Sequence, residues 1–82
     1  MSRKTSALID LARDVNLHRP GVSTLSLYVS GEFRGDVQVT SAELHRASET
    51  EPVRIVFRRK DVRVITLVSA AGWHHSTTDE VA

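Results

Sequence analysis

Apolar residues recur with a helical period near the start of the chain. Leu8, Leu11, Ala12 and Val15 follow the spacing i, i+3, i+4, i+7, and mostly polar or charged residues occupy the positions between them. This spacing places the four side chains on one face of a helix. The Pro20–Gly21 pair predicts its end. Because such a helix has a single apolar stripe, we expect it to pack on a sheet formed by the rest of the chain.

Strict alternation of apolar and polar residues then predicts a hairpin. Residues 24–30 place Leu25, Leu27 and Val29 on one face, and a second strand runs to about Thr40. A three-residue loop over 31–33 opposes Leu27 to Val37 and gives the hairpin one apolar and one polar face, so we expect that loop. Gly35 is expected to ease a β-bulge beside Phe33.

The pattern changes after Thr40. Thr40, Ser41, Ala42 and Glu43 fit a capping box, in which Thr40 caps the helix and Glu43 reaches back to it. We therefore predict one or two helical turns over 40–47, followed by a polar, acidic loop. Pro52 ends any helix before the next strand begins.

A second hairpin is predicted over residues 53–68. Val53, Ile55 and Phe57 alternate with Arg54, Val56 and Arg58, and a run of branched apolar residues follows from Val62. A four-residue loop over 58–61 opposes Phe57 to Val62 and Ile55 to Val64. The segment 62–68 is apolar on both faces, which is typical of a strand covered on both sides.

These elements predict an α+β fold. We expect an N-terminal amphipathic helix packed on an antiparallel sheet of two β-hairpins, four strands in all, with a short helical crossover between them. Residues 1–72 would form the single domain and residues 73–82 a loose C-terminal tail. A strongly bent half-barrel with the helix plugging one end is the alternative that the same pattern permits.

Composition limits what a chain of 82 residues does. This length supports one core and no second domain. The absence of cysteine excludes a disulfide scaffold and a thiolate metal site, and fits a cytoplasmic protein. No stretch approaches the roughly 20 apolar residues of a membrane span. We expect a cytoplasmic protein that makes no contact with membranes.

The second face of the second hairpin is the preferred functional candidate. In the predicted register it is apolar and rimmed by arginine, as protein-binding surfaces are. We expect a surface for another protein or for self-association there, made up of Val56, Ile65, Leu67, Arg54 and Arg63. The alternative is that the 41–47 helix, or the tail with Trp73, covers this patch within one chain.

The tip of the same hairpin is basic. Arg58, Arg59 and Lys60 are suited to contact phosphates, so the alternative function is a small nucleic-acid-binding protein, acting alone or as a dimer. The overall formal charge of +1 argues against it, and Phe57 is predicted to point inward, where it cannot stack on bases. A solvated turn with charges that prevent aggregation is the plainer explanation.

Nothing in the sequence predicts catalysis or a cofactor. It contains no nucleophile motif, no phosphate-binding glycine loop and no paired carboxylates in an apolar setting. His74 and His75 are adjacent, so on an extended chain they point to opposite sides and do not share one metal ion. We expect no enzyme activity, no cofactor, no metal and no small-molecule substrate.

The sequence therefore predicts a small, non-enzymatic protein-binding module. It would act as a regulator, inhibitor or adaptor by docking a sheet face and the basic hairpin on a partner protein. Its size alone suggests a product of a phage or mobile element.

Overall fold

The computed structural model describes residues 3–46 and 48–78, which form one helix and five strands. These elements are α1 Arg3–Leu17, β1 Val22–Val29, β2 Glu32–His45, β3 Arg54–Arg59, β4 Val64–Leu67 and β5 Trp73–Thr78. The strands form a single antiparallel sheet in the order β4-β3-β2-β1-β5. The α+β class is confirmed, with five strands where the sequence predicts four.

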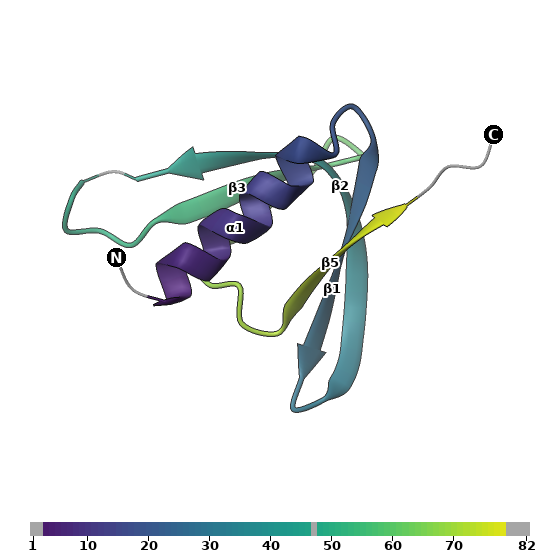
Figure 1. The fold of residues 1–82 in the computed structure, drawn as a ribbon, viewed down its shortest axis with the longest axis horizontal. Coiled ribbons are helices and arrows are strands. Elements are labelled where there is room, and N and C mark those ends of the chain that lie inside the picture. Colours follow the sequence, from purple (N-terminus) through teal and green to yellow (C-terminus); the bar gives the residue numbers. More distant parts are fainter. Residues whose placement is uncertain (1–2, 47, 79–82) are drawn as a thin grey trace.

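The helix packs as its apolar stripe predicts. α1 lies across one face of the sheet (Figure 1). Its stripe is buried against side chains from β1, β2 and β3, because only there does it leave water. The buried apolar residues are Leu8, Leu11, Ala12, Val15, Leu25, Val39, Ala42, Val53, Ile55 and Phe57. We call the sheet face under α1 the inner face and the opposite one the outer face.

The predicted helical crossover is wrong, because β2 continues as a strand to His45. The early part of β2 pairs with β1, and from Val39 onward it pairs with β3. Beyond the part of β2 that pairs with β1, the side chain of Asn16 forms hydrogen bonds with the β2 backbone. The Asn16 Nδ2 donates to the Ala42 carbonyl, and the Ala42 N–H donates to Asn16 Oδ1, both at 2.9 Å. Pairing on both sides therefore outweighs the local capping signal.

The first hairpin has a tighter turn than predicted. Ser30 and Gly31 form a two-residue turn, both with positive φ, of 52° and 79°. The predicted three-residue loop is thus wrong, and Leu25 lies opposite Val37. Phe33 and Gly35 pair with consecutive residues of β1, so Arg34 is the extra residue of a bulge. The expected bulge is confirmed, and it keeps the apolar residues on the inner face.

The register of the second hairpin is also wrong in the prediction. Phe57 lies opposite Ile65 and Ile55 opposite Leu67, three positions from the expected partners. Because side chains alternate between faces, this odd shift turns Ile65 and Leu67 to the inner face. There they are half-buried and pack against the core.

The fifth strand comes from the segment expected to be a tail. β5 pairs with β1 along six residues, from Leu27 opposite Trp73 to Val22 opposite Thr78. The Tyr28 N–H donates to the Gly72 carbonyl at 2.8 Å and joins the start of β5 to β1. The prediction of a loose tail is therefore wrong for 73–78, and residues 79–82 lie outside the described residues.

Candidate functional site

The structure does not bring the five predicted partner-binding residues together. Arg54 and Val56 belong to the outer face of β3, whereas Ile65 and Leu67 lie on the inner face of β4. Arg63 lies before β4 and donates its N–H to the Asp61 carboxylate at 3.2 Å. The predicted patch is thus split between two faces of the sheet.

The exposed apolar side chains at this end of the sheet include Val64 and Val68, but not the predicted Ile65 and Leu67. Val64 lies on the outer face beside Arg58 of β3, and Thr66 follows on the same face. Val68 comes directly after the end of β4. Val64 is 54% exposed and Val68 64% exposed. Apolar surface therefore exists at this end of the sheet, but it is made by residues that the predicted register turned inward.

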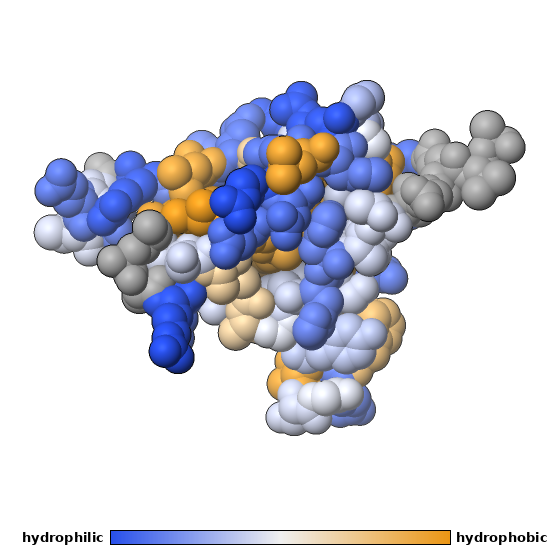
Figure 2. Space-filling model, viewed as in Figure 1, coloured by the Kyte–Doolittle hydropathy of each residue, from blue (hydrophilic) through white to orange (hydrophobic). Residues whose placement is uncertain are grey.

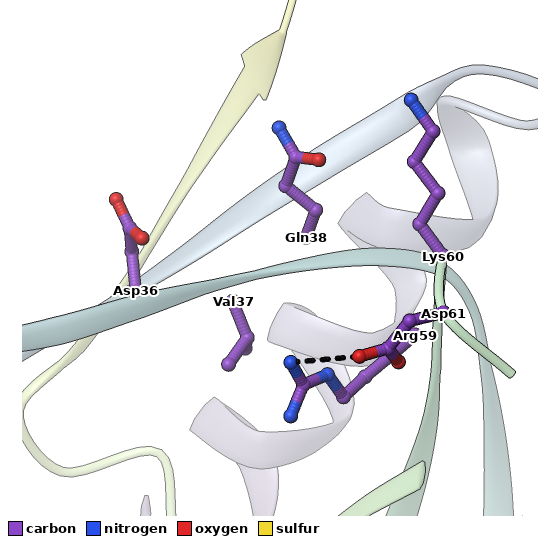
Figure 3. Close-up of a pocket in the computed structure, with 6 residues that line it drawn as sticks. All are labelled: Asp36, Val37, Gln38, Arg59, Lys60 and Asp61. Carbon is purple, nitrogen blue, oxygen red and sulfur yellow. Dashed lines mark ion pairs between the residues drawn. The ribbon is translucent and has the colours of Figure 1, made fainter. Parts of the chain in front are cut away.

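Arg58 and Arg59 of the basic tip contact carboxylates of the same chain. Arg58 donates from Nε and Nη2 to Glu43 Oε1, at 3.3 and 3.2 Å. Arg59 lies 3.1 Å from the Asp61 carboxylate. Figure 3 shows Lys60 on the opposite side of β2 from Arg59 and on the same side as Asp36. The three cations therefore do not form one continuous cationic surface, which a nucleic-acid groove requires.

The Glu43–Arg58 contact also changes the acidity of the carboxyl group. Hydrogen bonds and charge attraction from Arg58, then a hydrogen bond from His45, hold the pKa of Glu43 below its usual value of 4.5. His45 Nε2 lies 3.5 Å from the other Glu43 oxygen. Glu43 thus remains a carboxylate at neutral pH and keeps Arg58 occupied.

Three aromatic rings gather at the opposite end of the sheet. The rings of Tyr28 and Phe33 meet edge to face, with centroids 5.5 Å apart and planes at 61°. The rings of Tyr28 and His74 also meet edge to face, at 5.3 Å and 82°. Phe33 is 53% exposed and Tyr28 39% exposed. We call Tyr28, Phe33 and His74 the aromatic patch.

The fold explains why these three residues meet. The two-residue turn places Phe33 opposite Tyr28, and the start of β5 beside β1 places His74 next to Tyr28. All three point away from α1, since Tyr28 alternates with the inward Leu27. Figure 2, which looks onto the α1 side of the molecule, shows hydrophobic residues at the surface near the end of this hairpin, at the bottom of the view. Val29 and Phe33 of the hairpin are 45% and 53% exposed.

The sequence pattern alone did not predict the aromatic patch. It placed Phe33 inside a loop and His74 in a tail. The Ser30–Gly31 pair was the signal that could have found it, because a two-residue turn of this kind sets Phe33 opposite Tyr28.

Charges around the aromatic patch are mixed and close to balance. Arg34 lies 3.5 Å from the Glu32 carboxylate, so these two neighbours of Phe33 form an ion pair. Asp36 lies opposite Ser26 in the register and is exposed on the same outer face. A polyanion would meet carboxylates here, whereas a protein surface of mixed charge would not be repelled.

The described histidines do not form an accessible catalytic or metal-binding site. His75 Nε2 lies 2.9 Å from Ser23 Oγ, but Ser23 is only 1% exposed, so no substrate reaches this hydroxyl. His74 and His75 lie on opposite faces, as the sequence predicts. Among residues 3–46 and 48–78, no three histidine or carboxylate side chains gather closely enough to hold a metal ion.

A shallow groove between α1 and the sheet is a further apolar surface. It encloses about 350 Å³, and its most exposed apolar side chains are Leu17 and Leu44, at 76% and 60%. These two come from the end of the helix and the end of β2, on the inner side of the sheet.

Comparisons with protein-family models, characterised proteins and solved structures found no match to this chain. Within the part of the chain that the structure describes, no helix is long and apolar enough to cross a membrane.

Proposed function

We propose that this protein is a small, non-enzymatic protein-binding module that docks the aromatic patch on a partner protein, as a regulator, inhibitor or adaptor. The observation that carries the proposal is the exposed edge-to-face cluster of Tyr28, Phe33 and His74 on a sheet face that no core side chain occupies. The partner surface thus moves from the second hairpin, where the sequence predicts it, to the first.

Aromatic side chains are costly to leave in water and effective at interfaces. Tyrosine is enriched among the residues that contribute most to binding between proteins, and phenylalanine is enriched at interfaces in general. Here Tyr28 holds both other rings, so the group is already ordered before a partner arrives. Less side-chain entropy is then lost on binding.

The balanced charge around the patch supports a protein partner over a nucleic acid. The Glu32–Arg34 pair and Asp36 border the rings. At the other end of the sheet, Arg58 and Arg59 contact carboxylates of this chain. A strand of nucleic acid stacked on Tyr28 and Phe33 would therefore lack the cationic track that such complexes use.

The test compares proteins captured from the cells that naturally express this chain. One variant carries Tyr28→Ser and Phe33→Ser, and the matched control carries Leu17→Ser and Leu44→Ser, which also removes two exposed apolar side chains. We expect one protein partner that binds the wild type and the control. The patch variant should bind the purified partner about a hundredfold more weakly, or ~3 kcal/mol. Equal binding by all three would contradict the proposal, and so would capture of nucleic acid alone.

A further inference from the structure

The outermost strand β4 has the sequence properties of an interior strand. Val64 and Thr66 are exposed on its outer side, while Ile65 and Leu67 are half-buried on its inner side, and the exposed Val68 follows directly after the strand. Residues 64–68 contain no charge and no proline. Edge strands of soluble proteins are normally protected by charges, prolines, bulges or short length, because an open edge pairs readily with another strand. The four residues of β4 have only short length among these protections.

The backbone of β4 is oriented to accept such a strand. The Arg59 N–H donates to the Arg63 carbonyl at 2.8 Å, which makes these two residues a hydrogen-bonded pair. Hydrogen-bonded and non-hydrogen-bonded pairs alternate along an antiparallel ladder. Ile65 and Leu67 therefore direct their peptide groups toward β3, and Val64 and Thr66 direct theirs away from the sheet.

The sequence of this edge is nearly the same in both directions. Read from either end, Val64-Ile65-Thr66-Leu67-Val68 places a valine outermost, a branched aliphatic residue next and threonine in the centre. A strand of this kind is complementary to an antiparallel copy of itself. Two-fold symmetric dimers use the same patch on both subunits and need such self-complementarity.

We propose that β4 pairs with β4 of a second copy of this chain, antiparallel across a two-fold axis at Thr66. The two sheets would then continue into one sheet of twice the width. This proposal goes beyond the proposed function and does not depend on it, because the aromatic patch lies on β1, β2 and β5.

The register follows from which side chains would face each other. With the axis at Thr66, the two threonines lie opposite each other, Val64 faces Val68, and Ile65 faces Leu67. Threonine pairs and aliphatic pairs both stabilise antiparallel strands. With the axis at Ile65 instead, Leu67 would face the charged Arg63. The axis at Thr66 places Arg63 opposite Ser69 and leaves no like charges in contact.

The other edge of the sheet does not offer the same surface. β5 carries histidine, serine and threonine after Trp73, and it has no run of aliphatic residues. It therefore serves as the matched control edge. Ser76 is exposed on β5 and lies on the outer face, as Thr66 does on β4.

Sedimentation equilibrium across a wide range of concentration tests the proposal. We expect the wild type and the control Ser76→Lys to form dimers. Thr66→Lys and Thr66→Glu should each be monomers with an unchanged circular dichroism spectrum, because Thr66 is exposed in the single chain. Mixing these two variants should restore a dimer, since their opposite charges would meet on the axis.

Each contrary result overturns a named part of the proposal. A wild type that stays monomeric, or a Thr66→Lys variant that stays dimeric, would exclude pairing at β4. Failure of the two folded variants to associate would exclude the axis at Thr66. Binding of a partner protein through Tyr28 and Phe33 would persist in all of these cases, so failure of this proposal is distinguishable from failure of the proposed function.

Discussion

Val62 holds a backbone conformation that its side chain disfavours. It lies at the tip of the second hairpin with φ of 63° and is 96% exposed. The left-handed region costs an ordinary residue roughly 1–2 kcal/mol, and a β-branched side chain is rarer still there. We expect Val62→Gly to raise the free energy of unfolding by about 1 kcal/mol, measured by urea denaturation. Val62→Ala keeps a Cβ in the same conformation and should gain less. A lower stability for Val62→Gly would contradict the assigned turn.

The side chain of Asn16 supplies the hydrogen bonds to β2 that β1 does not make at Ala42. Its amide group accepts from and donates to the backbone of Ala42, where β1 no longer pairs with β2. We expect Asn16→Ala to lower the free energy of unfolding by about 1–2 kcal/mol, because two partly buried hydrogen bonds are lost. Arg13→Ala is the control, since it removes only an exposed ion pair with Asp10 and should cost less than about 0.5 kcal/mol. Equal losses of unfolding free energy for the two substitutions would show that the Asn16 hydrogen bonds do not stabilise the fold.

At the scale of elements, hydrophobic periodicity predicted a helix and a strand that each have one apolar face. The stripe of α1 and the alternation in β1 each have one apolar side, so burial leaves one solution, and the structure confirms the buried Leu8 and Leu25. Segment 62–68 is apolar on both sides, so the pattern could not choose between registers. The actual register depends on a three-residue loop whose last residue, Val62, has positive φ, a position normally held by glycine.

The capping box at Thr40 failed for a related reason. It is a local signal, and the competing interactions come from Asn16 and from β3, which are distant in sequence. The aromatic patch also depends on distant pairing, since His74 reaches Tyr28 only through β5. Sequence reasoning therefore found the elements that local burial determines and missed the site that joins three strands.

Gly72 allows β5 to begin against β1. It has φ of 78°, and a Cβ added there would overlap the carbonyl oxygen of Tyr28. Gly31 has nearly the same φ, 79°, but open space around it. We expect Gly31→Ala to cost about 1 kcal/mol for the backbone conformation alone. Gly72→Ala should cost at least about 2 kcal/mol more, because β5 must shift, which urea denaturation would measure. Equal losses would contradict the close approach of β5 to Tyr28.

The Glu43–Arg58 pair between β2 and β3 predicts a pH dependence. Because the pKa of Glu43 is lowered from 4.5 in the folded chain, the pair stabilises the fold above that value. The stabilisation is lost as the pH falls through the lowered pKa. We expect Glu43→Gln to be slightly less stable than the wild type at pH 7, with the difference closing below pH 4.5. A difference that stays constant in urea midpoints across this pH series would exclude the pair as its source.

At the scale of the whole molecule, one helix covers one face of a five-stranded sheet. The outer face carries exposed apolar side chains at both ends, in the aromatic patch and at Val64 of β4. The sequence predicted apolar surface on the second face of the second hairpin, and the exposed Val64 lies on that face. It predicted the wrong residues for that surface because the face of each strand depends on the register.

The central claim is that the aromatic patch contacts another protein, and photocrosslinking from position 33 tests it most directly. A photoreactive phenylalanine derivative at Phe33 keeps the ring, and the same group at the exposed Leu17 provides the control. After irradiation in the cells that naturally express this chain, we expect one discrete adduct from position 33 and none from position 17. Mass spectrometry should identify a different protein in that adduct. No adduct at position 33, or one formed only with a second copy of this chain, would contradict the claim.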